Sequence, residues 1–246
     1  MPTPVYAPIN RLKLVTADIW IVDGPLIRFG APCFRLPFPT RMTLIRLQGR
    51  QLFVHSPTPL LPDLQGDLRR VGQPRWIVAP NRLHYWWVPE WHAAFPDAAI
   101  YLAPSTKRQA GGRLSFDSLA LAAASGYPWD AEIATLPIAG SYLTEVVFFH
   151  PATRTLVLTD LIENFETRKL SSWLARVLTR LGGVQDPDGQ MPRDLRLTFR
   201  QQKAQLRAAV QTMIAWNPER IILAHGRWYR SRGTRELRRA FRWLLA

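Results

Sequence analysis

The sequence predicts a layered α/β fold with two β-sheets and helices on their outer sides. Three observations lead to this prediction: the first half has short apolar or alternating runs separated by Gly and Pro turns, the middle has the pattern of a β-hairpin, and the last third follows the order helix, helix, strand, helix. Short runs of this kind are typical of strands. Because strands and helices do not alternate regularly, a continuous series of βαβ units is the less favoured arrangement.

The first half is expected to be rich in strands. Residues 11–60 contain apolar or alternating runs that end in QLFVHSP, and residues 60–72 have the pattern of a short helix. These elements are followed in order by a buried strand at 75–81, a helix at 88–96, a strand at 98–104 and a loop-like stretch at 105–132.

The second half begins with strands and ends with helices. In TEVVFFHPATRTLVLTDL, two apolar runs joined at HPATR predict a hairpin. From residue 163 apolar side chains recur at helical spacing, and the same pattern returns at 199–216. PERIILAHG supplies a last strand, and a basic amphipathic helix follows at about 233–246. We expect residues 1–246 to form one domain, because this length suffices for a single large core.

The chain is strongly basic. It carries 32 Lys and Arg against 18 Asp and Glu, a formal net charge of +14, and only four of the basic residues are lysines. Arginine binds planar anions and aromatic faces, so a small anionic substrate, a nucleic acid, an acidic partner or a membrane surface would each fit this charge. A coding bias towards arginine would produce the same excess without any function. The sequence does not indicate an oligomeric state.

The expected location is the cytoplasm. No window approaches about 18 uncharged apolar residues, and the N-terminus lacks the pattern of a signal peptide, so no transmembrane segment is expected. The single cysteine, Cys33, excludes an internal disulfide and is interpreted as a small buried apolar residue.

Four hydrophobic runs end near a residue that can bind a metal ion. The runs are LFVHSP, APNRLHYW, TLVLTDL and IILAHG, and the candidate ligands are His55, His84, Asp160 and His225. Buried strands that end in a polar residue place that residue at the edge of a sheet, where α/β proteins bind ligands. Three imidazoles and one carboxylate suit Zn²⁺ or Fe²⁺ better than Mg²⁺ or Ca²⁺. The sequence therefore predicts one divalent metal ion, Zn or Fe.

The order of these motifs resembles the metallo-β-lactamase superfamily, in a branch with a degenerate metal-binding motif. The segments PFPTRMTLIRL, LFVHSP, IVAPN and VVFFHPATRTLVLTDL carry the resemblance, which covers about residues 17–230. It implies a four-layer αββα sandwich with a metal cleft at one sheet edge. Arg41 in the first segment could meet an anion, although a structural ion pair is the favoured interpretation.

The resemblance also indicates which ligands this chain has lost. The motif His-x-His-x-Asp-His of the superfamily falls on Ala79, Asn81, Leu83 and His84, so only its last residue is kept, and a further ligand histidine falls on Ser141. The histidines of the first metal site are thus replaced, whereas His84, Asp160 and His225 of the second site remain. His55 stands where the superfamily has Asp, and it could compensate for Leu83.

This resemblance implies a metal-dependent hydrolase with a single ion, acting on an ester, lactone, thioester or phosphoester. A ligand shell with an open position would activate water, whereas a closed shell of four ligands would make the ion structural. The candidate catalytic residues are Asp160, as the retained carboxylate, and Asn81, which could orient a water molecule or simply cap a turn.

The alternative function is that of a non-catalytic protein of this fold that binds nucleic acid or an acidic partner through its basic surface. Two predicted helices, SSWLARVLTRLGG and RELRRAFRWLLA, combine Arg with Trp and Leu and could also lie on a membrane surface. We expect instead that their apolar faces pack on the sandwich.

Overall fold

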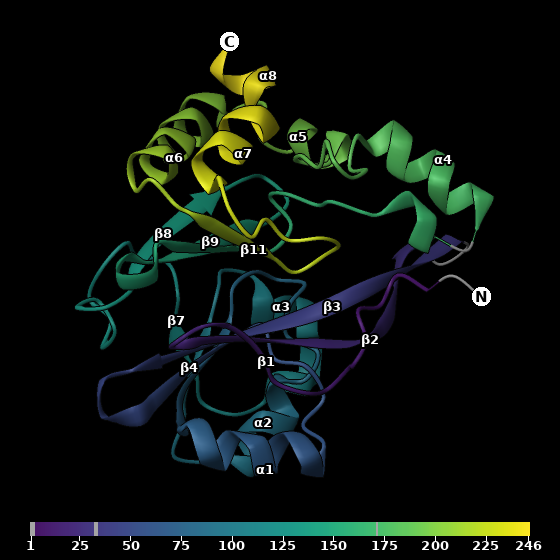
Figure 1. The fold of residues 1–246 in the computed structure, drawn as a ribbon. Coiled ribbons are helices and arrows are strands. Elements are labelled where there is room, and N and C mark those ends of the chain that lie inside the picture. Colours follow the sequence, from purple (N-terminus) through teal and green to yellow (C-terminus); the bar gives the residue numbers. More distant parts are fainter. Residues whose placement is uncertain (1–2, 32–33, 171) are drawn as a thin grey trace.

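The computed structural model describes residues 3–31, 34–170 and 172–246, and they form four layers (Figure 1). Two β-sheets lie face to face, with α1 (Pro62–Val71) and α2 (Val88–Ala94) outside one sheet and α6 (Lys203–Ala215) and α7 (Gly233–Ala240) outside the other. The predicted αββα sandwich is therefore confirmed. Cys33, interpreted as a buried apolar residue, lies outside the described residues.

The strands divide into a sheet of seven and a sheet of four. The first sheet contains, in spatial order, β1 (Lys13–Thr16), β2 (Ile19–Ala31), β3 (Phe34–Leu47), β4 (Gln51–His55), β5 (Gln73–Ala79), β6 (Ala99–Leu102) and β7 (Leu119–Ala120). The second contains β11 (Arg220–Leu223), β10 (Thr155–Leu158), β9 (Thr144–His150) and β8 (Ala134–Ala139). The remaining α-helices are α3 (Thr106–Ala110), α4 (Trp173–Gly182), α5 (Arg193–Leu197) and α8 (Arg242–Leu245).

Strand direction decides which strand ends meet. The pairs from β1 to β4 are antiparallel, and those from β4 to β7 are parallel. In the second sheet β8, β9 and β10 are antiparallel, and β10 pairs in parallel with β11. The predicted hairpin is confirmed, with His150 of β9 opposite Thr155 of β10. Because parallel neighbours run the same way, β4 ends beside β5, and β10 ends beside β11.

Three apolar cores separate the four layers. The alternation along β4 shows how the sequence produces two of them, because successive side chains of a strand point to opposite faces. Leu52 and Val54 pack with Leu64 of α1 and Trp91 of α2, whereas Phe53 packs between the two sheets. The third core joins the second sheet to the C-terminal helices through Leu156, Leu158, Val210, Met213 and Leu237.

The helix predicted from residue 163 begins only at Trp173. Residues 163–165 are extended and form single β-bridges to Gln190, Gly226 and Gln185, which prevents a helical start there. Within α4 the buried residues are Ala175 and Thr179, so the prediction that its apolar face packs on the sandwich is wrong for most of that face. Trp173 (74% exposed), Val177 (42%) and Leu181 (62%) lie on the surface. None of the helices within the described ranges has both the length and the apolar character needed to span a bilayer.

Candidate metal centre

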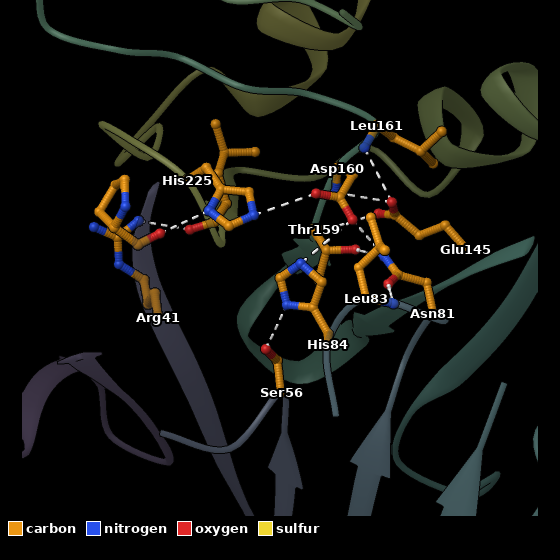
Figure 2. Close-up of polar contacts among 12 residues, drawn as sticks. Arg41, Ser56, Asn81, Leu83, His84, Glu145, Thr159, Asp160, Leu161 and His225 are labelled. Carbon is orange, nitrogen blue, oxygen red and sulfur yellow. Dashed lines mark hydrogen bonds and ion pairs between the residues drawn. The ribbon is translucent and has the colours of Figure 1, made fainter. Parts of the chain in front are cut away.

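The candidate ligands lie just beyond the ends of strands that meet at one edge of the sandwich. Strand β5 ends at Ala79, five residues before His84, while Asp160 and His225 each follow the last residue of β10 and β11 by two positions. Loops after buried strands leave such side chains free to converge. Figure 2 shows His84 and His225 on two sides of the Asp160 carboxylate.

His84, Asp160 and His225 form a compact group. One candidate ligand atom from each residue lies within 4.8 Å of the other two. Nε2 of His84 is 3.3 Å from Oδ2 of Asp160, and Nε2 of His225 is 3.2 Å from Oδ1 of the same carboxylate. All three side chains are at most 10% exposed. Two imidazoles and a carboxylate are a donor set suited to zinc or iron.

The second nitrogen of His225 fixes the orientation of its ring. Nδ1 lies 2.7 Å from the backbone oxygen of Pro39, which can only accept a hydrogen bond, so Nδ1 carries the proton. In a neutral ring the lone pair of Nε2 then points at an oxygen of Asp160, an arrangement that requires a cation between them or a second proton on the ring. Carbonyl oxygens behind a ligand histidine play this role in metal sites.

The protonation equilibria of the two residues follow from this arrangement. Burial lowers the pKa of His225, but the hydrogen bond to Asp160 and its negative charge outweigh burial, so that the pKa is raised. Burial raises the pKa of Asp160, but the charges and hydrogen bonds of His84 and His225 outweigh it and hold this pKa below its usual range. Asp160 is therefore anionic, and the group attracts a positive charge.

Ser56 holds the ring of His84 from behind. Its Oγ lies 2.7 Å from Nδ1 of His84, leaving Nε2 directed at Asp160 (Figure 2). Ser56 follows the last residue of β4 and adopts a left-handed backbone conformation, with φ of 53°, which is uncommon for a residue other than glycine. Ser56 was not predicted from the sequence, although it stands directly after the candidate ligand His55.

Asn81 is fully buried and makes three hydrogen bonds. Its Oδ1 accepts from the backbone N–H of Leu83, while Nδ2 donates to Oγ1 of Thr159 at 2.9 Å and to Oδ2 of Asp160 at 2.5 Å. Asn81 thus caps a turn and at the same time holds the carboxylate. Both ends of its amide are thus engaged in hydrogen bonds, one of them to Asp160 of the group.

Glu145 is a second residue that the sequence analysis missed. It is fully buried on β9, and its carboxylate accepts backbone N–H groups from Thr159, Asp160 and Leu161 at 2.7–3.0 Å (Figure 2). Burial and the charge of Asp160 raise the pKa of Glu145 to about 7. A single charged residue inside the apolar run EVVFFH was the available signal, because a buried carboxylate must find partners.

His55 does not join the group. It is 2% exposed, its ring contacts Phe148 with ring centres 5.6 Å apart, and neither ring nitrogen has a hydrogen-bond partner in the described part of the chain. Burial, together with the charge of His84, lowers the pKa of His55 to about 3, so the ring is neutral. Of the four predicted ligands, the structure brings three together and leaves His55 in the packing between the sheets.

Arg41 supports the loop that carries His225. It pairs with Asp23 through Nε and Nη2 at 2.8 and 2.7 Å, and its Nη1 donates to the backbone oxygens of Leu223 and Gly226. The favoured interpretation of Arg41 as part of a structural ion pair is confirmed. Arg41 holds both ends of the turn around His225 and acts on the group by keeping this turn in place.

A cleft of about 670 Å³ opens beside the group. Its lining is mainly apolar and includes His84, Asp160 and His225. Glu163 also lines the cleft, and burial raises the pKa of this carboxyl group to about 8. A volume of this size lies within the range of pockets that bind small molecules.

Several solved structures are similar to this chain over most of its length. The chain resembles a metallo-β-lactamase from Hirschia baltica (12% identity, TM-score 0.59, 98% of each chain covered) and the mono-zinc form of the metallo-β-lactamase FIM-1 from Pseudomonas aeruginosa (12%, 0.57, 100% of this chain and 98% of that one). It also resembles the metal-soaked Flv1 flavodiiron core from Synechocystis sp. PCC6803 (13%, 0.62, 100% of this chain and 62% of that one).

At these identities the likeness concerns the fold alone, which is that of the metallo-β-lactamases. No curated protein matches the chain. The family model described as "Domain of unknown function (DUF4336)" matches residues 19–173, a segment that includes β2 to β10 and two of the three grouped residues. Because this match covers more than half of the sequence, the chain belongs to the DUF4336 family.

Proposed function

We propose that the protein is a hydrolase that works with one divalent metal ion held by His84, Asp160 and His225. The observation that carries this proposal is the pair of contacts made by His225, whose Nδ1 faces the oxygen of Pro39 while Nε2 faces Asp160. The residues fit a cation, because Nδ1 of His225 already donates to Pro39, and Nε2 can therefore face the anionic oxygen at 3.2 Å only with a second proton on the ring or a metal ion between the two atoms. Zinc and iron are the ions that suit two imidazoles and a carboxylate.

Three ligands rather than four favour catalysis over a purely structural ion. A bound divalent ion with an open position supplies Lewis acidity, which lowers the pKa of water and polarises an ester, lactone, thioester or phosphoester. With His55 outside the group, the side chains grouped here leave such a position available. The neighbour FIM-1 is described in a mono-zinc form, which supports a site of one ion on this fold.

The residues of this chain contribute orientation and charge. Asp160 supplies the negative charge and an oxygen ligand, and its orientation is held by Asn81 through the 2.5 Å hydrogen bond. Glu145 fixes the backbone on both sides of Asp160, and Ser56 fixes the ring of His84. Asn81, Glu145 and Ser56 therefore act as positioning residues, as partners behind the ligands do in known metal sites.

The direct test is turnover with defined metal content. Chelated protein reloaded with Zn²⁺, Mn²⁺ or Fe²⁺ is assayed on a panel of esters, lactones, thioesters and phosphodiesters. At least one ion is expected to restore turnover, and His84→Ala and His225→Ala are expected to abolish it without unfolding the protein. His92→Ala is the matched control, since His92 lies outside the group and does not line the cleft. Intact folding without turnover on any substrate would exclude the proposal.

A second candidate function is supported by a separate feature of the surface. Four arginines surround a hollow beside the start of α7, namely Arg154, Arg232, Arg235 and Arg238. Such a cluster suits the phosphates of a nucleic acid. If it binds duplex DNA, a plot of the logarithm of the binding constant against the logarithm of the salt concentration should have a slope of about −0.9 for each phosphate contact. Charge reversal at Arg235 and Arg238 should make that slope less steep. Absence of binding at low salt would leave hydrolysis as the one proposal.

A further inference from the structure

The side chains that line the cleft indicate what kind of substrate it binds, which the metal-binding group alone does not. Apolar side chains from distant parts of the chain face the same space: Ile27 and Phe38 from the β2–β3 hairpin, Trp86 from the loop after β5, and Leu178 from α4. Phe165 forms an edge-on contact with Phe38, with ring centres 5.7 Å apart, and closes one side of this wall. Apolar walls of this extent select ligands by the hydrophobic area that they bury.

The charges around the cleft do not suit a small anion. Apart from the histidines, Arg193 is the single basic side chain among the described residues that line it, whereas Asp160 and Asp194 supply carboxylates and Glu163 supplies a third carboxyl group. The net charge of +14 is therefore carried mainly by other parts of the surface. The side chains of a cleft with more carboxylates than arginines would not steer an anionic substrate towards the group, so any attraction of an anion would have to come from the bound ion alone.

The mouth of the cleft is also apolar. Trp86 (39% exposed), Tyr142 (43%) and Leu181 (62%) line the cleft and are in contact with solvent at the same time. Val177 and Trp173 continue this surface along α4 without lining the cleft. Exposed apolar surface that is continuous with a cavity marks a site where an apolar ligand enters.

We propose that the cleft binds a linear acyl chain, so that the substrate is an ester or thioester of a medium-chain carboxylic acid. The inference rests on the proposed function, and it names the substrate class of the same site. In the reaction, the oxygen of water bonds to the acyl carbon, the bond from that carbon to the leaving oxygen or sulfur breaks, and the leaving group takes a proton. The products are a carboxylic acid and an alcohol or thiol, with no oxidation or reduction.

The chain would lie along the wall formed by Leu178 and Phe38, with its carbonyl end at His84, Asp160 and His225. This placement accounts for both properties of the lining, which combines the buried group His84, Asp160 and His225 with mainly apolar side chains. Each methylene group that enters the cleft should raise affinity about fourfold, which corresponds to the usual free energy of burying one such group.

The test measures binding in the absence of metal and of turnover. Chelated protein is titrated calorimetrically with hexanamide, octanamide and decanamide, which are uncharged analogues of the proposed esters and so bring no second anion to the carboxylate of Asp160. Affinity is expected to rise by about fourfold per methylene. Leu178→Asp should lower decanamide affinity by at least about tenfold, because it places a charge in the apolar wall. Val177→Asp is the matched control on the same helix, since Val177 does not line the cleft.

Leu178→Asn, which is uncharged, and circular dichroism of each variant separate loss of binding from loss of folding. Affinity that does not depend on chain length, or equal losses in Leu178→Asp and Val177→Asp, would overturn the inference. If binding depends on chain length but no metal ion gives turnover, the acyl-chain site stands and only the proposed hydrolase activity is rejected. Conversely, turnover of acetyl and decanoyl esters at equal efficiency would retain the hydrolase and reject the acyl-chain site.

A further arm distinguishes two sources of the chain. Cosedimentation with phosphatidylglycerol vesicles, with and without Val177→Asp, reports whether the acyl chain is taken from a membrane or from a soluble ester. Binding that Val177→Asp abolishes would support a membrane source through the exposed face of α4. Absence of vesicle binding, together with chain-length-dependent binding of the uncharged amides, would support a soluble ester.

Discussion

The backbone oxygen of Pro39 lies 2.7 Å from Nδ1 of His225, and this contact decides which nitrogen of the ring faces Asp160. Pro39 belongs to β3 in the first sheet, whereas His225 follows the last strand of the second. The contact therefore joins the two sheets at the edge where the candidate ligands meet. The orientation of the His225 ring therefore depends on how the two sheets are placed, because any shift between them would change it.

The first prediction concerns Asn81, which both caps a turn and holds the carboxylate. Asn81→Ala should lower the free energy of unfolding by about 1–3 kcal/mol, because Leu83 and Asp160 each lose a buried hydrogen-bond partner. Asn81→Asp keeps the cap but replaces the donor to Asp160 with a second carboxylate. This variant should be destabilised without metal and recover on addition of Zn²⁺. Chemical denaturation with and without the ion measures both effects, and wild-type stability of either variant in chelator would refute this role.

The second prediction concerns Glu145. Glu145→Gln leaves one oxygen to accept and adds an NH₂ group facing backbone donors, so the loop at residues 159–161 should lose its fixed position. We expect zinc affinity to fall by about 10- to 100-fold, as for other partners behind metal ligands. Glu132→Gln is the control, because Glu132 also accepts a backbone N–H, from Gln48, but at an exposed site. Competition with a chromophoric chelator gives the affinities, and identical values for the two variants would contradict the prediction.

The third prediction uses the pH dependence of stability. The pKa of His55 is lowered from 6.5 to about 3 in the folded protein, mainly by burial, so between these pH values the unfolded chain binds a proton that the folded protein does not. The contribution of neutral His55 to the free energy of unfolding is therefore fully present above about pH 6.5. As the pH falls towards 3 this contribution is lost, by up to about 1.4 kcal/mol per pH unit.

Replacing this histidine should remove that loss. His55→Phe is expected to be less sensitive to acid than the wild type and to bind zinc with unchanged affinity, since His55 is outside the group. Denaturation from pH 7 to pH 4 in chelator measures the first effect, and zinc titration at pH 7 measures the second. A large loss of zinc affinity would reinstate His55 as a fourth ligand.

The comparison of sequence and structure at these residues shows what local patterns can predict. A polar residue after a buried strand is a local feature, so the sequence indicated Asp160 and His225, and the order of strands placed them at one edge. His55 has the same local pattern but a different orientation. It lies two positions after Phe53, and the alternation of a strand places both side chains on the inter-sheet face. That alternation was visible in the sequence and could have excluded His55.

Contacts between residues far apart in the chain were not predictable in this way. Pro39 and His225 are separated by 186 positions, and Ser56 meets His84 across two strands. The first pair depends on how the two sheets are placed and the second on which strands are neighbours within one sheet, and no single segment determines either. The surface position of the apolar face of α4 has the same origin, because helical spacing shows that a face is apolar and does not show what it contacts.

The fourth prediction concerns Arg41, which joins Asp23 to the turn around His225. Arg41→Lys keeps the charge but cannot make the contacts to Asp23, Leu223 and Gly226 together. The free energy of unfolding should fall by about 3 kcal/mol, as when buried ion pairs are broken. Arg46→Lys, at the more exposed pair with Asp18, should cost less than about 1 kcal/mol. Similar small losses in both variants would show that Arg41 does not stabilise the turn.

The number of metal ions bound per chain tests the proposed centre most directly. Protein freed of metal with a chelator, reloaded with Zn²⁺ and desalted is examined by elemental analysis, together with His225→Ala and the control His92→Ala. One zinc ion per chain is expected in the wild type and in His92→Ala, and essentially none in His225→Ala, because that variant loses one of three ligands. Two ions per chain, or none in a folded wild-type protein, would contradict a single-ion centre at His84, Asp160 and His225.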